Sequence, residues 1–447
     1  KLGTAVKVSG KAMTFAGANL ADVPVNYRVV RSATFPWCRF WGWEYSLPST
    51  PAMEIENGTV QTNSEGKFEI EFTAIPDESL EGSWRPKFNY EVIADVVDIT
   101  GETQSATQNV SVGYQAIDLT VDVAELVEKE KVTEIKVKAM NLNGEPEPTK
   151  GKVEIHRLEA PKTLILPRKS SKPDQYIITK KDFQRIFPEA PYADEGNSDN
   201  WKRSEKVFDA SFDTEKGDSL TLQNIQQWPQ GVYELEANCK DKFGVEVKFT
   251  KRFTVFGGKE TELPLVQPLW VAPLKAFYEP GDTAVLDFGT SSDDGWMLME
   301  VVQNGKLIRS DWLCISNQRQ QIKFPIREEH RGDFDVRLLF VKHGRIYSEE
   351  KKVNVPWTNK QLTIEFATFR DKLLPGAKEE WLVKINGSKG EKVVAELLAA
   401  MYDQSLDAFR TQSWDWERWS GSFESLASWN EDGFEVVNGN LIQQNWN

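Results

Sequence analysis

The chain has 447 residues, of which 40% are hydrophobic, and 68 acidic against 54 basic side chains give it a net charge of −14. This acidic balance argues against a nucleic-acid partner, because a phosphate backbone would be repelled. The length predicts about three or four domains. No apolar run reaches the roughly 18 to 20 residues of a membrane span, so we expect no direct membrane insertion.

The first unusual segment is FPWCRFWGWEY, residues 35–45, which contains six aromatic side chains. It follows an alternating strand at 25–31, so we expect a long loop that either packs between modules or binds a sugar or peptide. A second such segment lies at 414–419. The candidate interaction surface consists of the tryptophans of both segments: Trp37, Trp41, Trp43, Trp414, Trp416 and Trp419.

Short alternating strands dominate the rest of the chain. Residues 68–72 and 117–123 place apolar side chains at every second position, which is typical of half-buried antiparallel strands. Asn-Gly pairs predict hairpin turns, because both residues accept positive φ angles; these pairs lie at 57–58, 143–144, 304–305, 386–387 and 438–439. The pattern predicts an all-β fold of tandem antiparallel β-sandwiches.

Internal repeats suggest the number of domains. Lys11-Ala12-Met13 recurs as Lys138-Ala139-Met140, and a pattern that runs from Tyr90 to Gly101 recurs from Tyr233 to Gly244. Phe334 begins a weaker third copy of that hairpin. The repeats predict four units: 1–113, 114–257 with an insertion at about 161–228, 258–357, and a partial sandwich with a tryptophan-rich tail at 358–447.

Two local segments need a choice between structures. Thr179 followed by Asp182 predicts a helix N-cap, and Pro188 ends the helix, so we expect a short amphipathic helix within the insertion. It either covers the second unit or binds a partner. Residues 393–401 have good helix propensity, but we interpret them as a buried strand.

No residue pattern indicates catalysis. The three cysteines, Cys38, Cys239 and Cys314, lie far apart and have no metal-ligand spacing, and only three histidines are present. The acidic pairs at 293–294 and 328–329 are expected to be solvated loop residues, and the Arg331-Gly332-Asp333 tripeptide is expected to be a chance loop sequence. We therefore predict no enzyme activity, no metal and no cofactor.

A family resemblance covers nearly the whole chain. Residues 2–17 and 25–31 resemble the third macroglobulin domain of bacterial alpha-2-macroglobulin-like proteins, and residues 278–282 resemble the start of the fifth. The resemblance to the sixth macroglobulin domain rests on three segments: 362–366, Leu374-Pro375-Gly376 and 401–406. In that family, sandwiches carry a protease-sensitive bait segment, and many members have a thioester in a Gly-Cys-x-Glu-Gln motif. None of the three cysteines here lies in that motif.

The resemblance implies a non-catalytic scaffold region of a bacterial protease trap. Its partners would be proteases, bound through the full-length protein, and the remaining macroglobulin and thioester domains of the same chain. It also implies a cell-envelope location, either periplasmic or anchored to the outer membrane, or the cell surface. A cell-surface adhesion or glycan- or peptide-binding module is the alternative, and an accessory region of a carboxylate-dependent glycosidase is a third hypothesis.

Overall fold

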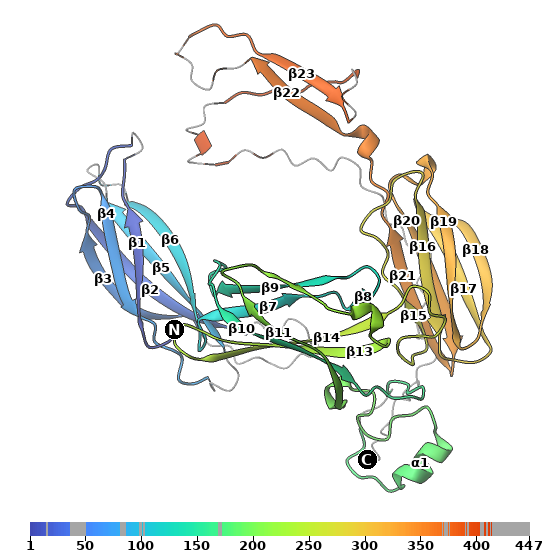
Figure 1. Ribbon diagram of the computed structural model, residues 1–447. Coiled ribbons are helices and arrows are strands. Elements are labelled where there is room, and N and C mark those ends of the chain that lie inside the picture. The colour runs from blue at the N-terminus through green and yellow to red at the C-terminus, as the bar shows by residue number, and fades with distance from the viewer. Residues whose placement is uncertain are drawn as a thin grey trace, which may run out of the picture. The chain divides into compact units, whose positions relative to one another are not determined.

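The computed structural model describes most of the chain as antiparallel strands, which confirms the all-β prediction (Figure 1). The chain divides into two compact units: Lys1–Ala160 with Trp201–Gly258, and Pro161–Asn200 with Lys259–Asn447. The described residues are 1–14, 17–35, 51–80, 86–97, 101, 103–168, 172–368, 370, 374, 376–388, 390, 393–402, 406–407, 410–411 and 413.

The first sandwich, in unit 1, packs a two-stranded sheet against a four-stranded sheet. The two-stranded sheet contains β1 (Ala5–Lys11) and β4 (Lys67–Thr73). The other has the spatial order β3 (Met53–Gln61), β2 (Pro24–Thr34), β5 (Lys87–Val97) and β6 (Thr103–Val112). Alternate side chains point to the common core, where the largest fully buried ones are Ile70, Phe72, Phe88 and Tyr90.

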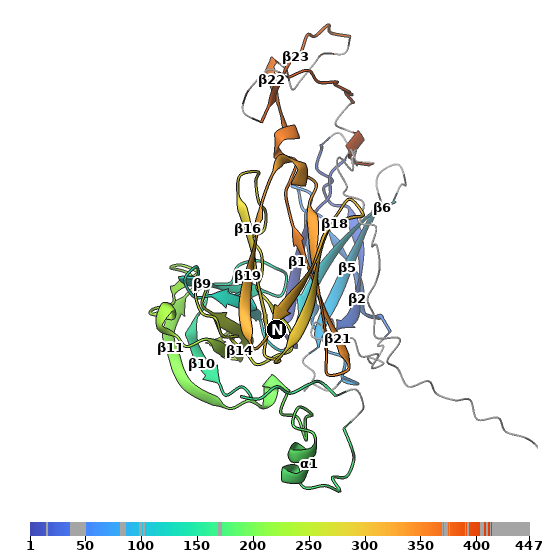
Figure 2. The same cartoon turned by 90° about the vertical axis from the view of Figure 1, so that its right-hand side faces the viewer.

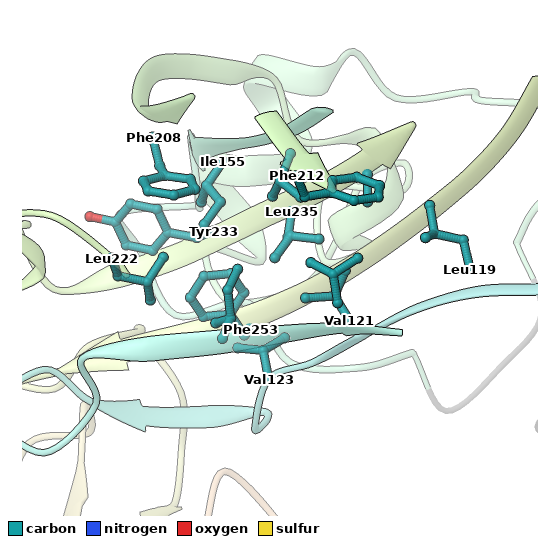
Figure 3. Packing of buried hydrophobic residues seen from close by; sticks show 14 of the residues in the cluster. Leu119, Val121, Val123, Ile155, Phe208, Phe212, Leu222, Tyr233, Leu235 and Phe253 are labelled. Atoms are coloured by element: carbon teal, nitrogen blue, oxygen red, sulfur yellow. The ribbon is translucent and has the colours of Figure 1, made fainter. Parts of the chain in front are cut away.

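The second sandwich completes unit 1. One sheet has the order β12 (Ser219–Thr221), β9 (Glu134–Asn141) and β7 (Ile117–Asp122). The other has the order β11 (Arg203–Asp213), β10 (Lys150–Leu158), β13 (Gly231–Lys240), β14 (Glu246–Phe256) and β8 (Leu126–Glu128), of which β8 pairs with β14 in parallel. Figure 3 shows the core between the sheets, where Tyr233, Leu235 and Phe253 lie among residues of the facing strands.

The third sandwich lies in unit 2. Its three-stranded sheet has the order β15 (Trp270–Val271), β16 (Thr283–Thr290) and β19 (Gln318–Pro325), and β16 and β19 are seen side by side in Figure 2. Its four-stranded sheet has the order β18 (Lys306–Ile315), β17 (Gly295–Gln303), β20 (Phe334–Lys342) and β21 (Arg345–Val353). Apolar residues from both sheets form one core, including Phe288, Met297, Met299 and Phe340.

The rest of unit 2 consists of a hairpin and a helical segment. The hairpin pairs β22 (Leu362–Thr368) with β23 (Leu382–Gly387). The predicted helix is present as α1 (Lys180–Ile186), and the side chain of its N-cap Thr179 accepts a hydrogen bond from the backbone N–H of Asp182. Four 3₁₀ turns complete the described elements: η3 (Ser198–Asn200), η4 (Ile225–Gln227), η5 (Glu328–His330) and η6 (Thr358–Lys360).

The insertion is shorter than the sequence predicted. Strands β11 and β12 lie within 161–228 but belong to the sheets of the second sandwich. The prediction missed β11 because charged residues occupy most of its first half, although Phe208 and Phe212 are buried in the core. The segment 161–202 remains outside the strands of that sandwich, and 161–200 clusters with unit 2.

The Asn-Gly pairs were only partly correct as turn signals. Asn304 and Gly305 have positive φ angles in the turn between β17 and β18, and Gly144 has a positive φ angle in the turn after β9. The pairs at 57–58 and 386–387 instead lie inside β3 and β23. At Gly58 the glycine serves close packing, because a Cβ there would lie 2.9 Å from the Tyr27 hydroxyl oxygen. The pair at 438–439 lies outside the described residues.

The sequence repeats correspond to repeated structure. Met13 forms an isolated bridge with Asn19, and Met140 forms the equivalent bridge with Pro146. Tyr90 and Tyr233 are both fully buried, and each hydroxyl donates a hydrogen bond to a backbone carbonyl, of Ile75 at 2.9 Å and of Pro229 at 2.5 Å. The repeated residues therefore mark equivalent core positions.

Candidate functional site

The candidate tryptophan surface is not placed by the structure. All six of its members lie outside the described residues, and so does Cys38. Their role therefore stays a prediction. The rest of the tryptophan-rich tail, residues 414–447, also lies outside the described part.

The hairpin β22–β23 is amphipathic, and its apolar face is exposed. The register places Ile364 opposite Ile385 and Phe366 opposite Val383, so these side chains share one face. The other face is polar, and Glu365 pairs there with Lys384 at 3.8 Å. Ile364 is 53% exposed and Phe366 is 54% exposed. A two-stranded hairpin is marginally stable alone, so this apolar face requires further sheet to pack against it.

The segment 393–402 has neither helix nor strand, so the predicted buried strand is wrong for the described structure. Val394, Leu398 and Met401 are all exposed. A strand forms only when a neighbouring strand accepts its backbone hydrogen bonds, and among the described residues none pairs with this segment. Both this segment and the hairpin therefore expose large apolar side chains, a feature that usually marks an interaction site when such side chains are contiguous.

Arg331 joins the third sandwich to the linker that precedes the hairpin. Its guanidinium is buried and donates hydrogen bonds to the Pro356 carbonyl at 2.6 Å and to Thr358 Oγ1 at 3.0 Å. It also forms ion pairs with Glu328 at 2.7 Å and Glu279 at 3.3 Å. The hydrogen bond to Glu328 raises the pKa of Arg331. The Arg-Gly-Asp tripeptide is therefore structural, because its arginine is not available to a receptor.

The described residues contain no catalytic constellation. They include no group of three or more His, Cys, Asp or Glu side chains that could hold a metal ion. Burial lowers the pKa of His330, whose Nδ1 accepts a hydrogen bond from the Arg327 backbone N–H at 3.0 Å. Burial also raises the pKa of the Cys239 thiol, which makes it a poorer nucleophile. We therefore interpret both the His330 ring and the Cys239 thiol as structural residues.

The most perturbed carboxylate belongs to a charge ladder on the five-stranded sheet. Burial alone would raise the pKa of Glu236, but hydrogen bonds from Asn238, Lys248 and Arg203 lower it to about 2. Arg203 also bonds Glu234 at 2.8 Å through Nε. These opposite charges on β11, β13 and β14 stabilise the sheet, so the shift reflects a structural network.

Comparison with known proteins shows where the chain has its family signature. Residues 269–408 match the model of the alpha-2-macroglobulin bait region domain. This part of the chain therefore resembles an alpha-2-macroglobulin bait region domain. This confirms the predicted resemblance. The domain begins at β15, includes the third sandwich, and extends through the β22–β23 hairpin into the exposed apolar segment. No curated protein matches the chain.

Solved structures with a similar arrangement have low sequence identity. A trypsin-activated alpha-2-macroglobulin from Escherichia coli is 12% identical, with a TM-score of 0.35, and the match covers 86% of this chain and 25% of that one. A mutant of Salmonella alpha-2-macroglobulin is 12% identical, with a TM-score of 0.27, and covers 86% and 24%. An ice-binding adhesin from an Antarctic bacterium is 10% identical, with a TM-score of 0.15, and covers 81% and 72%.

At these identities and TM-scores the structural likeness carries no functional argument. The bait-domain match over 269–408 therefore carries the resemblance to this family. The chain spans about a quarter of the length of the two macroglobulin chains. Within the described residues, no helix is both long and apolar enough to cross a membrane.

Proposed function

We propose that the chain is a non-catalytic scaffold region of a bacterial alpha-2-macroglobulin-type protease trap at the cell envelope. The observation that carries the proposal is the bait-domain match over 269–408, which ends in the exposed apolar part of unit 2. The domain boundaries near 113, 257 and 357 belong to the same proposal. No described residue favours the adhesion or glycan-binding alternative, which depends on the tryptophans outside the described part.

The hairpin gives this proposal a structural basis. The hairpin exposes an apolar face of the kind that forms one side of a sandwich core, as expected if an inserted bait segment separates the two halves of one domain. We propose that the tail at 411–447 covers the apolar face and leads toward the bait segment. A chain truncated after Arg410 would then expose the face and aggregate, while the 447-residue chain would stay soluble.

The trap function is tested with the full-length protein and a panel of proteases. A trapped protease should lose activity on large protein substrates but keep activity on small peptides that still reach its active site. Cleavage should occur first after residue 410, as read by mass spectrometry. The 447-residue chain alone should leave protease activity unchanged. Stoichiometric inhibition by that chain, or full-length protein that leaves large-substrate cleavage intact, would disprove the proposal.

A further inference from the structure

Strand β18 is an unusually apolar sheet edge. It lies at the end of the four-stranded sheet of the third sandwich and, among the described strands, pairs only with β17. Leu307 is 49% exposed, Ile308 is 55% exposed and Trp312 is 63% exposed. An edge strand presents unpaired N–H and C=O groups, and exposed apolar side chains make pairing with another strand favourable.

The equivalent edges elsewhere are protected. The strand at the same edge position is β3 in the first sandwich and β11 in the second. Strand β3 carries Glu54 and Glu56, and β11 alternates acidic with basic residues along its exposed positions. The opposite edge of the same sheet, β21, carries four consecutive charged residues at 349–352. Charges on an edge oppose association, whereas β18 combines the exposed apolar Leu307, Ile308 and Trp312 with the charged Lys306, Arg309 and Asp311.

We propose that β18 is a self-association edge that pairs antiparallel with β18 of a second copy, around a two-fold axis at Ser310. In this register Arg309 lies opposite the partner's Asp311, and Asp311 lies opposite the partner's Arg309. Ile308 lies opposite the partner's Trp312. The two-fold symmetry repeats each pair. Each of the two charge pairs therefore joins a positive to a negative side chain, and each Ile308–Trp312 pair joins an aliphatic to an aromatic side chain.

Neighbouring symmetric registers are worse. Centring the axis on residue 309 brings two arginines together, and centring it on residue 311 brings two aspartates together, and like charges directly opposite are destabilising. Arg309 and Asp311 already lie on one side of the strand, with Arg309 Nε 2.6 Å from Asp311 Oδ2. The bulge opposite Val301 and Val302 falls at Ile308, so the proposed centre at Ser310 lies in the regular part of β18 and the Ile308–Trp312 pairs lie at the limit of that part.

The outer surface beside this edge extends the apolar contact. Trp312 lies opposite Leu298 on β17, and Trp296, which is 60% exposed, lies opposite Cys314. Leu298 in turn lies opposite Leu339 on β20. Joining two copies edge to edge would therefore place two such surfaces next to each other in one continuous sheet. The nearby thiol of Cys314 is free and exposed.

The first test is a symmetric disulfide in the 447-residue chain. With Cys38 and Cys314 changed to Ser, Ser310→Cys places one thiol beside its copy on the axis, within the separation that a cross-strand disulfide requires. Mild oxidation should give a covalent dimer. Ser348→Cys on β21 is the matched control, because it lies on the opposite edge of the same sheet, and it should give no covalent dimer. Equal cross-linking of both variants would overturn the assigned edge.

The second test reverses the charges. Arg309→Asp places Asp opposite Asp, and Asp311→Arg places Arg opposite Arg, so each variant alone should dimerise about tenfold more weakly. Mixing the two variants restores both opposite-charge pairs across the interface but not the pair within either strand. Sedimentation velocity should therefore detect a heterodimer in the mixture. A wild-type chain that stays monomeric, or a mixture no better than its components, would overturn the proposal.

Discussion

The strongest prediction for stability concerns the buried ion pair between Arg319 and Asp287 in the third sandwich. The Arg319 side chain is 2% exposed and bonds both carboxylate oxygens of Asp287, with Nε 3.2 Å from Oδ1. Gln321 Nε2 donates to the same carboxylate at 3.1 Å, and the guanidinium lies 4.7 Å from the centre of the Trp270 ring. Both carboxylate oxygens of Asp287 are therefore held in place.

Changing Arg319 to Met leaves the Asp287 carboxylate buried without its counter-charge. Removing one partner of a buried pair costs about 3–5 kcal/mol, whereas replacing both partners by apolar residues is often nearly neutral. We expect the Arg319→Met variant to lose that amount of unfolding free energy, and the Arg319→Met/Asp287→Leu variant to recover most of it. Arg327→Met, which breaks an exposed pair with Glu329, is the matched control and should cost about 0–1 kcal/mol.

Hydrogen exchange measured by mass spectrometry suits this experiment, because the chain has several cores and global unfolding is not one transition. Peptides covering β16 and β19 should exchange about two to four powers of ten faster in the Arg319→Met variant. Peptides from unit 1 serve as an internal reference. Equal protection in Arg319→Met and Arg327→Met, or a double variant as unprotected as Arg319→Met, would refute the reasoning.

Two further predictions address the sandwich cores. Burial raises the pKa of Tyr90 and of Tyr233 to about 12, so unit 1 should keep its full stability below pH 10 and lose about 1.4 kcal/mol per pKa unit and tyrosine as the pH rises from 10 to 12. Phenylalanine variants titrated in parallel should lack this loss, and an identical alkaline profile would contradict it. Gly295→Ala should cost about 1–3 kcal/mol, because its Cβ would lie 2.4 Å from the Phe340 ring. Gly217→Ala, where a Cβ meets nothing within 4 Å, should be nearly neutral when both variants are compared by hydrogen exchange.

Local sequence patterns predicted the strands best where one face is buried and the other solvated. The alternating residues from Ile117 to Val123 form β7 and its continuation, and all the apolar ones are buried in the second core. The Thr179 cap predicted α1 equally well, because the capping hydrogen bond spans three residues. These signals depend on neighbours in sequence.

The predictions failed where distant strands decide the structure. An Asn-Gly pair favours a turn, yet the pair at 57–58 continues β3, because backbone pairing with β2 and the Tyr27 ring fix its conformation. The linker contacts of Arg331 were also not predictable, since Glu279 and Pro356 are far from it in sequence. A signal was present for the buried ion pair, because Asp287 interrupts an otherwise apolar strand.

Two exposed apolar surfaces in unit 2 call for different partners, and their geometry distinguishes them. The hairpin exposes a face, with Ile364 and Phe366 on one side and a polar surface on the other. A face is covered by a second sheet packed about 10 Å away, which a half-sandwich receives from its own domain. Strand β18 instead belongs to a sandwich whose core is already filled, so its interior needs no further sheet. What β18 offers is backbone hydrogen bonding and self-complementary charges at Arg309 and Asp311. The presence of the tail that covers the hairpin should therefore leave dimerisation through β18 unchanged. Variants that break the β18 pairing should leave the solubility of the 447-residue chain unchanged.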